Sequence, residues 1–171
     1  LLVHRPELFS TFYKGVTPLH IAASFGSSAT VEIILEAGAN PRAISISGFD
    51  IVTYAALGFG APQTFHMWAE RFPEWDWNRG EPKLFGVTPI ATAVQYGAEH
   101  KLGVIKSLVA VGANPVYFAD TGSHTLVGAA ANPDISEETI RYLLSLPGVK
   151  DLVDVPMRPR TLGWWLRYKL T

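Results

Sequence analysis

The sequence predicts an all-α fold, a solenoid of helix-turn-helix repeats joined by extended fingers. Two observations predict it. The stretch Gly-Val-Thr-Pro-Leu-His-Ile-Ala-Ala at residues 15–23 returns in altered form at residues 86–94. Each copy is followed by Gly-Ala-Asn-Pro, at residues 38–41 and again at residues 112–115. Matching openings with matching endings at similar spacing are typical of stacked supersecondary repeats.

The first copy contains its own helix signals. Thr17 stands at an N-cap position, where its hydroxyl can accept a backbone N–H of the first turn, and Pro18 follows where a missing N–H costs nothing. Leu19, Ala22 and Ala23 then lie on one face of a helix. Small side chains let neighbouring helices approach closely, so the alanines at these places are predicted to be buried between stacked repeats: Ala22, Ala23, Ala55, Ala56, Ala93, Ala129 and Ala130.

These motifs resemble the ankyrin repeat, in which a Thr-Pro-Leu-His-x-Ala opening starts the first helix of a repeat of roughly 33 residues. The resemblance is strong over residues 15–47, good over residues 86–121 and degenerate elsewhere. It implies an ankyrin-like all-α solenoid with extended β-hairpin-type fingers. It also implies that His20 is structural and bonds the adjoining turns, and Ala91 at the matching place in the later copy agrees.

Capping residues and hydrophobic spacing place the helices in order. Gly26 is expected to end the first helix in the left-handed conformation. Asp50 replaces threonine as the cap in the second repeat, Thr125 begins the first helix of the fourth, and Ser136 caps the helix after it. Helices are predicted at about residues 17–25, 29–37, 62–72, 89–96 and 100–111.

The repeat frame predicts a single array over residues 1–171, and the chain is expected to be a piece of a longer protein. The predicted segments are residues 1–14 as the end of a truncated repeat, 15–47, 48–85, 86–121 and 122–161 as repeats, and 162–171 as the start of a further repeat or a C-terminal helix.

Composition narrows the function classes. Hydrophobic residues make up 48% of the chain, which favours a packed core over disorder. The 14 Lys and Arg against 15 Asp and Glu give no basic excess, so nucleic-acid binding by bulk charge is not expected. The absence of cysteine removes disulfides, thiolate catalysis and zinc-finger sites. No apolar run approaches the roughly 18 residues of a membrane span.

No catalytic constellation is present in the sequence. It contains no phosphate-binding Gly-rich loop ending in Lys-Ser/Thr, no Gly-x-Ser-x-Gly and no His-Glu-x-x-His. The five histidines are scattered one per repeat, so no metal site is predicted. Glu74 and Asp76 are interpreted as solvated acids beside two tryptophans. The segment is predicted to be non-catalytic and to need no cofactor.

Two function classes remain. The leading one is a protein–protein interaction module that binds through a concave surface of fingers and first helices. The alternative is a structural or scaffold region of a large assembly, which could be membrane-associated and in which the segment with Trp164 and Trp165 docks. The expected partner is another protein or another region of the parent chain. Small molecules, nucleic acid and direct membrane insertion are not expected, and an intracellular location, in the cytoplasm or an organelle interior, is predicted.

The resemblance implies which residues face a partner: those around each finger glycine and those after each alanine pair. Tyr13, Phe25, Phe49, Phe85 and Tyr96 would form an aromatic track along the concave side, unless several of them pack onto neighbouring fingers. The full set by repeat is Tyr13, Lys14, Val16, Ser24 and Phe25; Ile46, Ser47, Phe49 and Leu57; Leu84, Phe85, Val87, Gln95 and Tyr96; and Asp120, Ser123 and Asn132.

The second repeat is longer than the others, and its extra length is placed in residues 75–85. Trp77 stands where other repeats have proline and is predicted to be structural. Trp75 stands where they have alanine, and with Arg79 and Lys83 it is predicted to contact a partner. The alternative is that both rings only cover the core of this repeat.

Overall fold

The computed structural model describes residues 15–58, 61–96 and 101–157, apart from the side chain of Leu84. Within these residues the chain forms eight α-helices and no β-strand, so the all-α prediction is confirmed. The predicted β-hairpin character of the fingers is not confirmed, because the pairing found in this part of the chain consists of two isolated bridges, Glu81 with Val87 and Phe118 with His124.

The contacts divide the chain into two compact units, Leu1–Trp75 and Asp76–Thr171, which we call the N-terminal and C-terminal units. Each contains two helix pairs in its described residues. The single array over residues 1–171 stays a prediction.

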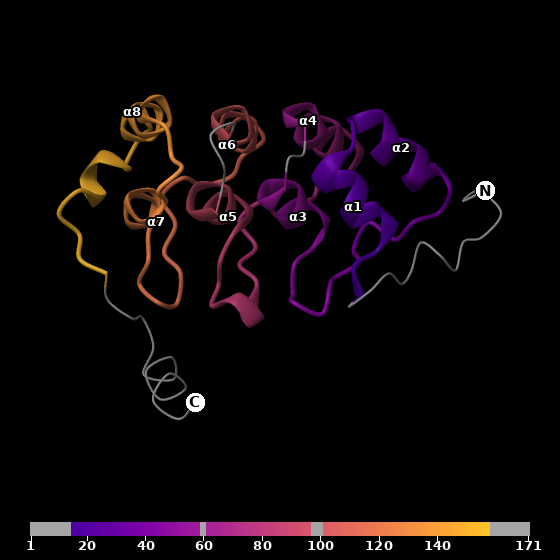
Figure 1. Ribbon diagram of the computed structural model, residues 1–171, viewed down its shortest axis with the longest axis horizontal. Helices are drawn as coiled ribbons and strands as arrows, with labels where there is room; N and C mark the ends of the chain where they lie inside the picture. Colours follow the sequence, from indigo (N-terminus) through magenta and orange to yellow (C-terminus); the bar gives the residue numbers. More distant parts are fainter. Residues whose placement is uncertain (1–14, 59–60, 97–100, 158–171) are drawn as a thin grey trace. The chain divides into compact units, whose positions relative to one another are not determined.

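In the N-terminal unit, α1 (Pro18–Phe25) packs against α2 (Ser28–Glu36) and against α3 (Ile51–Leu57). The helix α4 (Pro62–Arg71) packs against α2. The first helices of the two repeats, α1 and α3, thus form one layer and the second helices, α2 and α4, form another (Figure 1).

The predicted caps of the N-terminal unit are confirmed. The Thr17 hydroxyl accepts the backbone N–H of His20, and the Asp50 carboxylate accepts that of Thr53 at 2.7 Å. One detail is wrong: Gly26 has φ −92°, which is not left-handed. A Cβ at Gly26 would lie 2.6 Å from the carbonyl oxygen of Ala22, so this glycine is required by close approach.

The C-terminal unit contains α5 (Pro89–Tyr96), α6 (Lys101–Ala110), α7 (Thr125–Ala131) and α8 (Glu137–Ser145). The helix α5 packs on α6 and α7, and α6 packs on α8. Two short 3₁₀ helices complete the unit: η4 (Pro82–Leu84) in a finger, and η5 (Lys150–Leu152), which packs on α8.

The alanine prediction holds with one exception. Ala22, Ala23, Ala55, Ala56, Ala93 and Ala129 are all buried. Ala130 is exposed, which corrects the prediction. Its counterpart Ala23 is covered by α3 of the following repeat, whereas the described residues contain no first helix that follows α7.

The loops after the second helices share one turn. In each, a carboxylate or amide oxygen accepts the backbone N–H two residues later, from Asn40, Asp76 or Asn114. This turn aligns Asp76 with the two asparagines, and therefore places Trp75 at the alanine position and Trp77 at the proline position, as the sequence indicated. Trp77 is 7% exposed, as expected for a structural residue.

Candidate interaction surface

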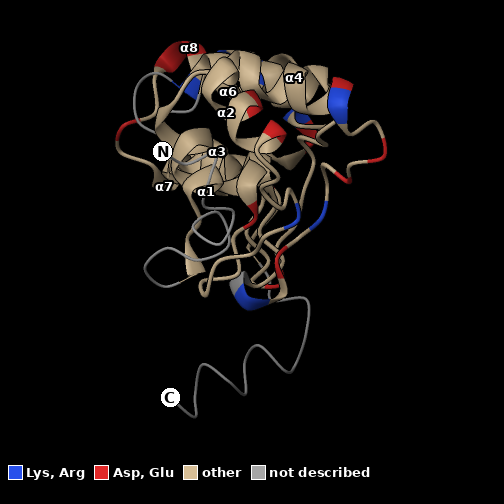
Figure 2. Cartoon of the chain, turned by 90° about the vertical axis from the view of Figure 1, so that its right-hand side faces the viewer, with Lys and Arg blue, Asp and Glu red and all other residues tan. Residues whose placement is uncertain are grey.

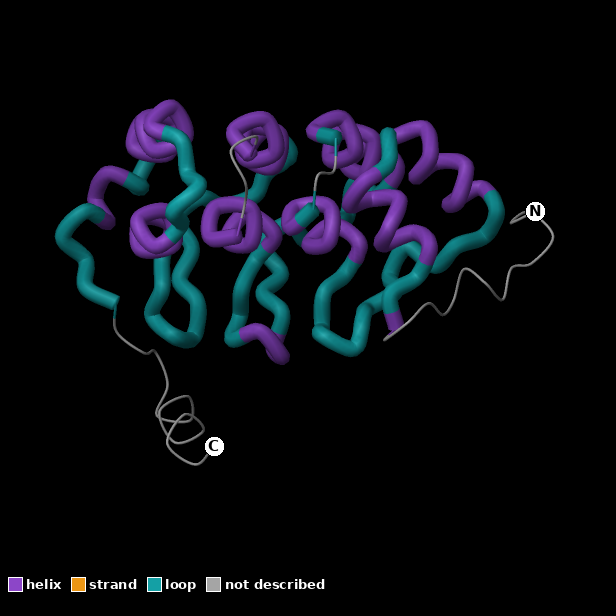
Figure 3. The backbone as a smooth tube through the Cα atoms, in the orientation of Figure 1, coloured by secondary structure: helices purple, strands orange, loops and turns teal. Residues whose placement is uncertain are grey.

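The fingers run between a second helix and the next first helix, and in each unit they extend beyond the first helices, away from the second helices (Figure 3). In the N-terminal unit the finger spans residues 43–49. The backbone N–H of Ser45 donates to the Phe49 carbonyl, and that of Gly48 donates to the Ser45 carbonyl, both at 2.9 Å. Gly48 has φ +91°, a left-handed conformation that glycine adopts without strain. The tip is thus held in one shape.

This finger presents two isoleucines. Ile44 is 44% exposed and Ile46 is 65% exposed, while Ser45 between them is buried. An ideal Cβ at Gly15 would lie 3.3 Å from the Cγ1 atom of Ile46, so the tip rests against the start of the first repeat. The contact prediction contained Ile46 but missed Ile44. The alternation of isoleucine, serine and isoleucine could have identified it.

A second finger with the same backbone pattern occupies residues 117–123 of the C-terminal unit. The N–H of Ala119 donates to the Ser123 carbonyl at 2.8 Å, and Gly122 donates to the Ala119 carbonyl at 2.9 Å. These bonds align Ala119 with Ser45, and therefore Asp120 with Ile46. Asp120 is exposed, and its Cγ lies 3.6 Å from an ideal Cβ at Gly86. At one repeat position the two units carry an aliphatic side chain and a carboxylate.

The long finger at residues 79–87 differs at its tip. Glu81 donates its N–H to the Val87 carbonyl, and Gly86 donates to the Glu81 carbonyl, so four residues lie between the bonded pair where the other fingers have two. The additional residues form η4 and end at Phe85, which is left-handed at φ +57°. The Phe85 carbonyl accepts the N–H of Asp120 at 2.7 Å. Part of the predicted insertion is thus this tip turn.

Most of the predicted contact residues within the described part of the chain are at least partly exposed. Tyr13 and Lys14 lie outside the described residues, as does the side chain of Leu84. The exposed or half-exposed members are Val16, Phe25, Ile46, Ser47, Phe49, Leu57, Trp75, Arg79, Lys83, Phe85, Val87, Gln95, Tyr96 and Asp120.

Three predicted contact residues are buried, which corrects their placement on the surface. The Ser24 hydroxyl donates to the Tyr54 carbonyl at 2.9 Å, and the Asn132 side-chain amide donates to the Val94 carbonyl at 2.9 Å. Ser123 is 8% exposed. Ser24 and Asn132 connect a first helix to the next within their units, because polar side chains near a helix end satisfy carbonyls of the neighbouring helix.

His20 has the structural role that the resemblance implied. Its Nδ1 accepts the backbone N–H of Thr17 at 3.1 Å, which leaves Nε2 to carry the proton and to donate to the Phe49 carbonyl at 3.3 Å. Its ring also meets Tyr54 edge to face, with centroids 4.9 Å apart. Burial lowers the pKa of His20, and the Phe49 carbonyl and Asp50 oppose that shift in part. His20 thus connects α1 to the next finger.

Trp75 is part of an aromatic cluster in the N-terminal unit. It packs edge to face on Trp68 at 5.3 Å and lies 6.2 Å from Phe72. The Arg42 guanidinium stands over the Trp75 ring at 5.5 Å and is 3.6 Å from the carboxylate of Glu74. The ring remains half-exposed, so it both covers the end of α4 and presents an edge at the surface.

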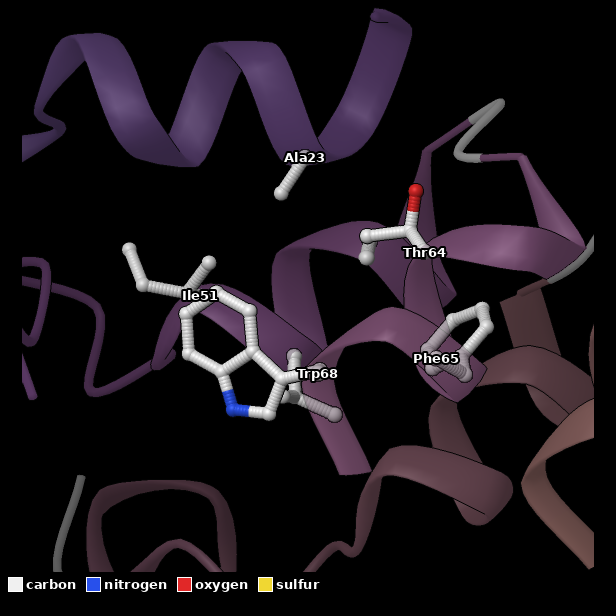
Figure 4. Close-up of a pocket in the computed structure, with 7 residues that line it drawn as sticks. Ala23, Ile51, Thr64, Phe65 and Trp68 are labelled. Carbon is white, nitrogen blue, oxygen red and sulfur yellow. The ribbon is translucent and has the colours of Figure 1, made fainter. Parts of the chain in front are cut away.

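A pocket between α1, α3 and α4 is lined by Ala23, Ile51, Phe65 and Trp68 among others (Figure 4). The space is apolar and has no room for a water molecule. The hydroxyl of Thr64 and the indole nitrogen of Trp68 border it and find no hydrogen-bond partner among the described residues. We interpret the pocket as part of the core.

One lysine in the C-terminal unit has a lowered pKa. Lys101, at the start of α6, is 6% exposed, and burial lowers the pKa of its ammonium group to about 8.

Across the described ranges, no group of three His, Asp or Glu side chains could hold a metal ion. None of the helices in those ranges has both the length and the apolar character needed to cross a membrane. Trp164 and Trp165 lie outside the described residues.

Comparison with known proteins supports one part of the chain directly. Residues 14–46 match the family model described as ankyrin repeat. No curated protein matches the chain. The match covers α1 and α2 with the Thr17 cap and His20, and it ends within the finger at residues 43–49.

Proposed function

Because this chain carries an ankyrin repeat within an all-α ankyrin-like fold, we propose that it is a non-catalytic interaction module that binds a partner protein, or another region of its parent chain, through its fingers and first helices. Ankyrin repeats are generally protein–protein interaction modules and typically lack catalytic activity. The fold alone does not name a partner. The case for this binding surface therefore depends on the exposed residues of the fingers.

The observation that carries the proposal is the exposure of large apolar side chains at fingers and first helices. Phe25 on α1 is 64% exposed, and Ile46, Phe85 and Tyr96 are also exposed. Each finger that presents such a residue is fixed by backbone hydrogen bonds at its base, so little ordering is needed on contact. Exposed apolar side chains on a pre-organised surface favour an interface.

The test compares the fingers with the second helices within each unit. A photo-crosslinking amino acid is introduced at Ser47 or Asp120, which are exposed on fingers, and separately at Glu32 or Lys106, which are exposed on the second helices. We expect the finger positions to yield discrete cross-linked products in an extract and the second-helix positions to yield none. Addition of excess unlabelled protein should suppress the products. Products only from Glu32 and Lys106, or equal yields from the finger and second-helix positions, would contradict the proposed surface.

A further inference from the structure

We propose that the finger at residues 43–49 and helix α1 bind an uncharged, apolar segment of a partner protein. This inference rests on the proposed function and specifies the chemistry of the partner. It begins with four exposed side chains in the N-terminal unit. Ile44 and Ile46 lie two apart on the finger, and Ile21 and Phe25 lie four apart on one side of α1.

The second observation is the absence of exposed charge from these elements. Between Gly15 and Gly58 the chain contains four Asp, Glu, Lys or Arg residues. Glu32 and Glu36 lie on α2, and Arg42 follows α2 and pairs with Glu74. Asp50 is 4% exposed and caps α3. The finger and α1 therefore offer no exposed charge, and Figure 2 shows α1 without a charged residue.

The C-terminal unit provides the contrast. At the position of Ile46 it carries the carboxylate of Asp120, and its long finger carries the exposed side chains of Arg79 and Lys83. Because the two finger tips have the same backbone hydrogen bonds, Ile46 and Asp120 occupy one repeat position, and the units differ there in side-chain chemistry.

The physical reason for an uncharged partner is the desolvation of charge. A charged side chain placed against Ile44, Ile46 and α1 would lose water and gain no counter-charge from the described residues of the finger and α1, which is unfavourable. Aliphatic or aromatic side chains would instead remove apolar surface of both partners from water. The Ser45 and Gly48 hydrogen bonds hold the backbone that carries the two exposed isoleucines in place before contact.

The experiment selects peptides from a random phage-displayed library on the full chain and measures a synthetic copy of the most enriched peptide by fluorescence anisotropy. We expect the selected peptides to contain fewer Asp, Glu, Lys and Arg residues than the library. Ile46→Asp, which copies Asp120 into the matched position, should raise Kd about tenfold or more. Ile33→Asp makes the same change at an isoleucine that is 61% exposed on α2, so it is the matched control and should change Kd by less than about twofold.

The outcomes separate the inference from the proposed function. Enrichment of charged peptides, or unchanged binding by Ile46→Asp, would overturn the inference and leave the proposed function standing. A chain that selects no peptide would argue against both. If wild type sediments as a dimer that Ile46→Asp dissociates, the surface binds a second copy and the inference fails. Because Ile46 rests against Gly15, Ile44→Asp serves as a second variant if Ile46→Asp misfolds.

Discussion

Two first helices, α1 of the N-terminal unit and α7 of the C-terminal unit, begin differently. In the N-terminal unit, Thr17 caps α1 while His20, three residues later, completes the capping box and reaches the Phe49 carbonyl of the next finger. In the C-terminal unit, His124 stands at the cap position of α7 and makes no side-chain cap bond. Its Nε2 donates to the Val155 carbonyl at 2.8 Å, and its Nδ1 finds no partner within the described ranges.

The difference shows that capping and connection to the following loop are separable tasks. In α1, Thr17 provides the cap bond and His20 provides the contact with the following loop. In α7 the histidine at the cap position provides the connection, and the cap bond is absent. The helix α7 still forms, because its apolar face packs on α5. Tertiary packing can thus replace a local signal, and substitutions at matched positions should have unequal effects in the two units.

The largest expected difference in stability is between alanine variants of Trp75 and Trp77, the two tryptophans on either side of the sequence boundary between the units. Trp77→Ala removes a nearly buried ring of the C-terminal unit and should lower the free energy of unfolding by about 3–5 kcal/mol. Trp75→Ala removes a half-exposed ring that packs on Trp68 and should cost only about 1 kcal/mol. Urea denaturation monitored by far-UV circular dichroism measures both. Equal losses would indicate that Trp75 is a core residue and would remove it from the proposed interaction surface.

A smaller effect is expected at the second alanine of the pair. Ala23→Leu places a larger side chain against Ile51 and Trp68 and should destabilise the protein by about 1–3 kcal/mol through overpacking. Ala130→Leu at the matched position of α7 should change stability by less than about 0.5 kcal/mol, because Ala130 is exposed. Thermal unfolding of the two variants provides the comparison. A neutral Ala23→Leu would show that the repeat alignment is wrong.

The N-cap hydrogen bond of α1 should contribute less to stability than the packing of Ala23. Thr17→Ala removes the hydroxyl that accepts the His20 N–H and should cost about 1 kcal/mol. Hydrogen exchange at the His20 amide should become faster. His124→Ala should leave exchange at the matching amide of Val127 unchanged relative to the rest of α7, because no cap bond is lost there. Selective acceleration at Val127 would mean that His124 acts as a cap in solution.

The smallest expected effect is a pH dependence of stability, which arises from His20 in the N-terminal unit. The folded-state pKa of His20 lies below the value of about 6.5 expected when unfolded. Between these values the unfolded state binds more protons, so stability is full above about pH 6.5 and falls as pH drops toward the folded-state pKa. Unfolding by urea at several pH values between about 7.5 and 5.5 tests this.

His20→Gln is the control for that measurement. Glutamine at the third helical position can complete a capping box with Thr17 but does not titrate. The carboxylates titrate in both proteins, so the difference between the two profiles isolates His20. A variant whose stability falls as steeply as that of wild type would show that the imidazole is not the group responsible.

The sequence by itself determined the helices, because their signals are local. Thr17, Asp50 and Ser136 cap the helices that follow them, and the predicted helix at residues 89–96 has the observed bounds. Alignment with the Gly-Ala-Asn-Pro endings also predicted the repeat positions of Trp75 and Trp77, and the turns at Asn40 and Asp76 agree with that alignment. Such signals need only neighbouring residues, so the resemblance over residues 15–47 and the capping pattern are sufficient to predict an all-α repeat fold.

Only the tertiary structure decided which side chains face outward. Ser24 and Asn132 were expected on the surface, but each is buried because a carbonyl of the neighbouring helix in its unit lies within hydrogen-bond distance. Ala130 is exposed although its sequence context matches that of Ala23. Phe85 is left-handed at a finger tip with no sequence signal for it. Burial depends on the element that packs against a residue, and a repeat frame read from one stretch of chain does not contain that neighbour.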